Sequence, residues 1–103
     1  LIRRDFLEAF ERCDALLAPT SPGPAFALGE LRDDPMKMYL SDLFTLSCNL
    51  ASLPGLSLPC GFAKAGLPIG LQVLGKPFDE EALFAIGQAY EQATDWHTRA
   101  PAL

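Results

Sequence analysis

The sequence lacks any cluster of basic residues. Only 8 of its 103 residues are Lys or Arg, against 13 Asp or Glu, which gives a formal net charge of −5 at pH 7. The longest basic run is the pair Arg3-Arg4. Because binding to nucleic-acid phosphates requires clustered Lys and Arg side chains, this segment is not expected to hold nucleic acid by itself.

Cysteine and histidine are equally scarce. The three cysteines, Cys13, Cys48 and Cys60, form no CxxC pair, so the sequence indicates neither a disulfide scaffold nor a metal site, and we expect reduced, buried thiols. The single histidine, His97, lies in a polar tail, and the sequence has no Gly-x-Ser-x-Gly turn. We therefore interpret His97 as a surface or capping residue and expect no Ser-His-Asp triad here.

No apolar run in the sequence could span a membrane. The longest charge-free stretch, residues 43–63, is interrupted by Pro54-Gly55 and by Pro59. Proline has no backbone N–H and ends a helix, so this stretch predicts a buried helix followed by a buried strand. We expect no membrane contact.

The spacing of apolar residues predicts an α/β fold. Helical periodicity from Ile2 to Cys13 predicts a first helix, and because no capping residue precedes it, we expect a fragment of a longer polypeptide. The apolar run 15–18 predicts a strand covered on both faces, as in the parallel part of an α/β sheet. The segment from Thr20 to Pro35 is rich in Pro, Gly and Asp and predicts a loop.

A hairpin and a last helix complete the predicted order of elements. Alternating apolar residues over 56–60 and 69–74 predict two antiparallel strands, with Pro59 favouring an edge or irregular position. Asp79 is expected to cap a helix over 80–93. Together with the helix described next, the order is helix, strand, loop, helix, strand, strand and helix.

The middle helix is predicted to be a core helix that contains one charge of interest. It is expected to start with Asp34 as N-cap and Pro35 at the first helical position, and it is apolar on two faces. Asp42 is the only charge between Lys37 and Lys64. A buried carboxylate needs a partner, which could be a basic residue from elsewhere, backbone N–H groups or a substrate ammonium. A carboxylate on the helix surface, exposed to solvent, is the structural alternative.

Several segments resemble the amidase signature family, in the same order along essentially the whole chain. NLASLPG and PIGLQ match stretches shared widely among amidases, whereas YLSD and YEQATDWH are more specific to the glutaminase (A) subunits of tRNA-dependent amidotransferases. The resembling segments are DALLAPTSPGP (14–24), MYLSDLF (38–44), NLASLPG (49–55), SLPCG (57–61), GLPIGLQVL (66–74), GKPFDE (75–80) and YEQATDWH (90–97). The resemblance implies that residues 1–103 are the C-terminal portion of a single amidase signature domain, a mixed sheet flanked by helices.

This resemblance also implies a function. The A subunit would hydrolyse glutamine and release ammonia, which a partner B subunit would use, with ATP and Mg²⁺, to convert Glu-tRNA(Gln) to Gln-tRNA(Gln). The implied partners are the B and C subunits of a heterotrimer, with tRNA held mainly by the B subunit, in the cytoplasm or in an organelle. No cofactor or metal is expected in this segment.

The resemblance places the catalytic residues outside this sequence. The family uses a Ser–cis-Ser–Lys triad near a Gly-Ser-Ser-Gly-type stretch, and this sequence has no Gly-Ser-Ser. The catalytic N-terminal part is therefore expected to be absent and the segment alone to be inactive. One site residue carries over by resemblance: Asp42 would hold the α-ammonium of substrate glutamine. Two other interpretations stay open, a fragment of a small-amide hydrolase of the same family and a non-catalytic interaction module.

Overall fold

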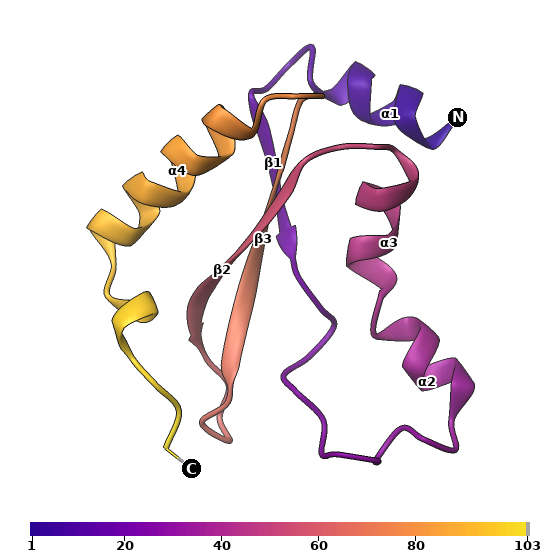
Figure 1. The fold of residues 1–103 in the computed structure, drawn as a ribbon, viewed down its shortest axis with the longest axis vertical. Helices are drawn as coiled ribbons and strands as arrows, with labels where there is room; N and C mark the ends of the chain where they lie inside the picture. Colours follow the sequence, from indigo (N-terminus) through magenta and orange to yellow (C-terminus); the bar gives the residue numbers. More distant parts are fainter. Residues whose placement is uncertain (103) are drawn as a thin grey trace.

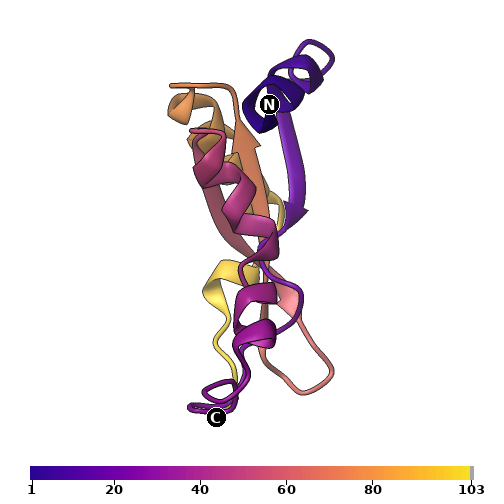
Figure 2. The same cartoon turned by 90° about the vertical axis from the view of Figure 1, so that its right-hand side faces the viewer.

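The computed structural model describes residues 1–102 as a three-stranded antiparallel sheet with helices on both faces (Figures 1 and 2). The strand order is β1-β3-β2, so β3 is central. Helix α4 packs on one face of the sheet, and α1 and α3 lie on the other. The elements are α1 (Ile2–Ala9), β1 (Ala15–Pro19), α2 (Pro35–Leu40), α3 (Leu43–Leu50), β2 (Gly55–Phe62), β3 (Pro68–Gly75), α4 (Glu80–Ala93) and the 3₁₀ turn η1 (Trp96–Thr98).

The core has two parts, one on each face of the central strand. Neighbouring residues of a strand point to opposite faces, and Val73 and Leu74 of β3 are both buried. Leu74 belongs to the cluster under α1 and α3, which contains Phe10, Cys48, Ala51, Leu53 and Leu74. Val73 belongs to the cluster under α4, which contains Leu58, Val73 and Leu83.

The first strand differs from the parallel strand predicted from the sequence. β1 pairs antiparallel with β3, from Ala15 opposite Gly75 to Pro19 opposite Leu71, and forms one edge of the sheet. Leu17 is 64% exposed, so the strand is not covered on both faces within residues 1–102. A uniformly apolar run carries no information on strand direction, because direction is set by the partner strand.

The predicted core helix is instead two short helices. Between α2 and α3 the chain leaves the helical path at Ser41 and Asp42. The Ser41 hydroxyl donates to the Met38 carbonyl (2.6 Å), and the Asp42 N–H donates to the Tyr39 carbonyl (3.2 Å), a three-residue spacing that tightens the last turn of α2. Ser and Asp favour such breaks because their side chains compete with backbone hydrogen bonds. In α2 no residue is buried, and in α3 only Cys48 is, so the prediction of a core helix is wrong for the described residues.

The predicted hairpin is confirmed. β2 and β3 pair antiparallel, and β2 forms the second edge of the sheet. The register shifts between Pro59 and Gly61, and Gly61 has a φ of +153°, which side-chain-bearing residues rarely adopt. Pro59 therefore lies on an edge strand beside a bulge, as its missing N–H predicts.

The two predicted helix caps have different outcomes. The Asp34 carboxylate accepts the Lys37 N–H (3.1 Å) at the start of α2, which confirms this cap. Asp79 precedes α4 as predicted, but its side chain makes no capping hydrogen bond. No helix within residues 1–102 is both long enough and apolar enough to cross a membrane.

Candidate functional site

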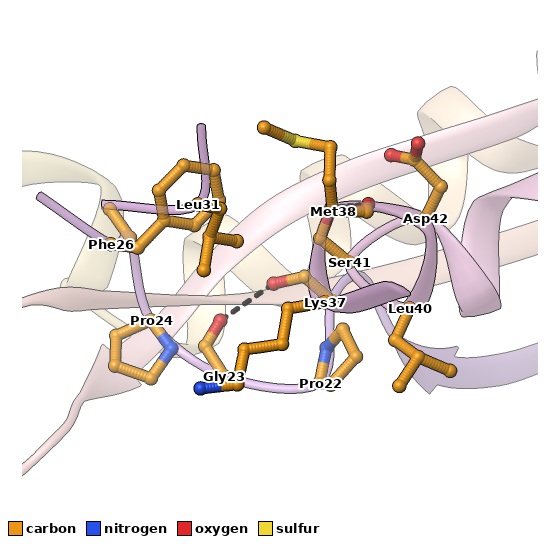
Figure 3. Close-up of a pocket in the computed structure, with 12 residues that line it drawn as sticks. Pro22, Gly23, Pro24, Phe26, Leu31, Lys37, Met38, Leu40, Ser41 and Asp42 are labelled. Atoms are coloured by element: carbon orange, nitrogen blue, oxygen red, sulfur yellow. Dashed lines mark hydrogen bonds between the residues drawn. The ribbon is translucent and has the colours of Figure 1, made fainter. Parts of the chain in front are cut away.

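A pocket lies where the loop after β1 faces α2 and the junction between α2 and α3 (Figure 3). Its volume is about 560 Å³. Most of the lining is apolar, and the two charged residues in it are Lys37 and Asp42. The lining residues are Ser21, Pro22, Gly23, Pro24, Ala25, Phe26 and Leu31 from the loop, and Lys37, Met38, Leu40, Ser41 and Asp42 from the helical side. We call residues 21–26 the loop wall and residues 37–42 the helix wall.

The loop wall is stiffened by its own sequence. Pro22 and Pro24 fix two backbone φ angles around Gly23. The Ser21 hydroxyl donates to the Gly23 carbonyl (2.7 Å), which closes the turn locally. These local features restrict the conformations open to the loop wall.

Asp42 forms the end of the helix wall. Its backbone carbonyl starts α3 by accepting the N–H groups of Thr45 (3.2 Å) and Leu46 (3.0 Å). Its carboxylate makes no capping hydrogen bond and no ion pair with any residue among 1–102. Among residues 1–102 the side chain is exposed, so no described residue buries this carboxylate.

The two serine hydroxyls of the pocket already have hydrogen-bond partners. The hydroxyls of Ser21 and Ser41 both donate to backbone carbonyls of their own turns. Figure 3 shows Lys37 reaching along the loop wall toward Gly23 and Pro24, while Asp42 points to the other side of the pocket. An unpaired carboxylate beside apolar side chains suits a ligand with a cationic group and a short aliphatic part.

The other titratable candidates lie outside this pocket. His97 is exposed in η1, which packs against β2. Cys48 is buried, its thiol donates to the Leu53 carbonyl (3.1 Å), and burial raises the pKa of that thiol. Cys13 and Cys60 are half-buried, and all three cysteines are free thiols. Within residues 1–102, no three His, Cys, Asp or Glu side chains converge as metal ligands.

Sequence reasoning missed the loop wall and Lys37. The run Pro22-Gly23-Pro24 signals a rigid turn, but nothing local shows that this turn faces a helix more than ten residues later. Gln72 was also missed, because the alternation along β3 puts it on the strand face opposite the apolar residues Leu71 and Val73. It is the one polar residue in the core of residues 1–102.

The sequence of this chain is similar to that of known amidases. The family model described as Amidase matches residues 1–84. The chain is 62% identical over its full 103 residues to the A subunit of the glutamyl-tRNA(Gln) amidotransferase of Myxococcus xanthus, and covers 21% of that protein. It is thus similar to about a fifth of the length of the curated relatives that it matches.

Solved structures of proteins in the same family share the fold of this chain. The crystal structure of the A subunit of glutamyl-tRNA(Gln) amidotransferase from Thermotoga maritima superposes with a TM-score of 0.84 at 42% identity, over 90% of this chain and 20% of that one. A 6-aminohexanoate cyclic dimer hydrolase superposes with a TM-score of 0.81 at 27% identity, over 96% of this chain and 22% of that one. These likenesses confirm the resemblance and the fold class predicted from the sequence motifs.

Proposed function

Because this chain belongs to the amidase family, we propose that it forms part of the glutaminase subunit of a tRNA-dependent amidotransferase. The intact protein would hydrolyse glutamine and release ammonia for the amidation of Glu-tRNA(Gln). The 62% identity to the M. xanthus protein over the whole chain supports this choice within the family. As further parts of this proposal, the intact protein would assemble with B and C subunits, tRNA would be held mainly by B, and the complex would lie in the cytoplasm or in an organelle.

In this proposal Asp42 binds the α-ammonium of glutamine. The observation that carries it is the Asp42 carboxylate, which lines the pocket and has no partner among residues 1–102. A substrate ammonium would complete a charge-assisted hydrogen bond there, and the apolar lining would contact the aliphatic chain of the substrate. An amide without an ammonium would not make this charged contact, so the site would prefer an amino acid to a simple amide.

The chemical step would use residues outside this segment. No Lys or His side chain among residues 1–102 hydrogen-bonds to a serine or cysteine, so the segment offers no activated nucleophile. The nucleophile, its base and the contact to the substrate carboxylate would come from the rest of the domain. ATP and Mg²⁺ would be bound by the partner B subunit.

A second candidate function is hydrolysis of a small amide without any tRNA. The 27% identity to a 6-aminohexanoate cyclic dimer hydrolase over 96% of this chain favours it, because that protein is named as a hydrolase. The intact heterotrimer should be assayed with glutamine and with glutaramate, which is glutamine without its α-amino group. A clear preference for glutamine supports the proposed glutaminase, and equal use of the two amides refutes it in favour of the small-amide hydrolase.

A further inference from the structure

We propose that Gln72 is a positioning residue that sets the distance between the loop wall and the helix wall of the pocket. This proposal rests on the proposed function, because the distance matters only if a substrate binds between the walls. Gln72 lies in the middle of β3, the central strand, and is only 4% exposed. A buried carboxamide needs hydrogen-bond partners, and the identity of those partners carries the inference.

The side-chain nitrogen of Gln72 bridges two residues that flank the walls, one before the loop wall and one after the helix wall. Nε2 donates to the Phe44 carbonyl at 2.8 Å and to the Pro19 carbonyl at 3.4 Å. Both acceptors are carbonyls, which fixes which end of the carboxamide is the nitrogen. Phe44 lies two residues after Asp42, and Pro19 lies two residues before Ser21. One NH₂ group therefore connects the start of α3 with the start of the loop wall.

The loop wall has a second attachment to the sheet at its start. Thr20 N–H donates to the Gly70 carbonyl (3.2 Å), and the hydroxyls of Thr20 and Ser57 are 2.7 Å apart. A Cβ on Gly70 would lie 2.8 Å from the Thr20 hydroxyl oxygen, so the closeness of the contact requires glycine there. The start of the loop wall is thus tied to β3 through Thr20 and Gly70 and to β2 through Thr20 and Ser57. The hydrogen bond from β3 to the residues that follow the helix wall is the one made by Gln72.

The position of Asp42 depends on that tie. The 2.8 Å bond from Gln72 Nε2 to the Phe44 carbonyl is a directional restraint two residues from Asp42. Without this bond the carboxylate would sample positions that no longer match a substrate ammonium held against the loop wall.

The experiment compares Gln72→Met and Gln72→Asn in the intact heterotrimer. Methionine keeps the length of the side chain and removes the donor, and asparagine keeps the carboxamide but is one methylene too short to span both carbonyls. We expect either variant to raise the KM for glutamine about tenfold or more, with kcat within about twofold and the KM for glutaramate unchanged. One variant has an apolar side chain and the other a polar one, so the test can still be read if one of them fails to fold.

Val73→Ala is the matched control. Val73 is the neighbouring residue and is fully buried, but it points to the α4 face, away from the pocket. Its truncation should lower stability while leaving the glutamine-to-glutaramate ratio unchanged. If the Gln72 variants also leave this ratio unchanged, the positioning role is refuted.

A double variant separates positioning from a direct effect. If Gln72 acts through Asp42, then Gln72→Met added to Asp42→Asn should raise the KM for glutamine no further. Independent, multiplying effects of the two substitutions would overturn the proposal. A wild-type complex that uses glutamine and glutaramate equally would instead refute the proposed function, and the Gln72 proposal with it, before any variant is compared.

Discussion

The substitution Asp42→Asn should impair glutamine use and leave folding almost unchanged. Asparagine has nearly the same shape, and the Asp42 side chain is exposed, with no hydrogen bond or ion pair among residues 1–102. The change in the free energy of unfolding is therefore expected to stay within about 0.5 kcal/mol. Loss of a negative charge at the start of α3 adds at most a few tenths of a kcal/mol, because the helix is short and its end is exposed.

The expected loss of activity follows from one charge-assisted hydrogen bond. A hydrogen bond that involves charged groups contributes about 1.5–3 kcal/mol. At about 1.36 kcal/mol per factor of ten, kcat/KM for glutamine should fall by about ten- to 150-fold. Glutaramate has no ammonium, so its kcat/KM should change by less than about twofold.

The assay is ammonia release by the intact heterotrimer from each amide, together with a urea unfolding curve for each protein. Asp33→Asn is the matched control, since Asp33 is exposed in the loop before α2 and does not line the pocket. Asp33→Asn removes one negative charge from an exposed position outside the pocket. The reasoning is refuted if Asp42→Asn leaves glutamine use unchanged, or if Asp33→Asn lowers it equally.

Three further predictions test the packing, the thiols and the missing nucleophile. Gly75→Ala should destabilise the intact protein by about 1–3 kcal/mol in urea unfolding, because the new Cβ would lie 2.9 Å from the buried Leu83 side chain. Its control is Gly23→Ala, where a Cβ would have no atom within 4 Å, and this variant should change the free energy of unfolding by less than about 1 kcal/mol. A similar loss for both would contradict the packing argument. Cys48 should react with iodoacetamide more slowly than Cys13 and Cys60 in peptide mapping at pH 8, because burial raises the pKa of the Cys48 thiol and fewer thiolates form; equal rates would contradict this. A protein limited to residues 1–103 should release no ammonia from glutamine, and turnover by a pure sample would show that the segment holds a nucleophile after all.

The sequence alone predicts the local elements of this protein well. Alternating apolar residues predict the β2–β3 hairpin, and the missing N–H of Pro59 predicts its place on an edge strand. Asp34 followed by Pro35 predicts the start of α2 to the residue. The motifs along the chain also predict the family, which the comparisons confirm. All of these depend on residues near one another in the chain, where spacing and side-chain chemistry are enough.

Only the tertiary structure decides the site. β1 is antiparallel because its partner is β3, more than fifty residues later, and no pattern within an apolar run encodes that choice. The break at Ser41 and Asp42 arises from hydrogen bonds to the preceding turn, which helical periodicity does not reveal, and it moves the carboxylate from a predicted core to a pocket edge. Gln72 reaches Phe44 and Pro19 only because the sheet brings three distant segments together. The sequence by itself therefore determined most of the elements and the family, and it singled out Asp42 as the candidate carboxylate. Contacts between distant segments decided where the middle helix breaks and which groups face one another across the pocket.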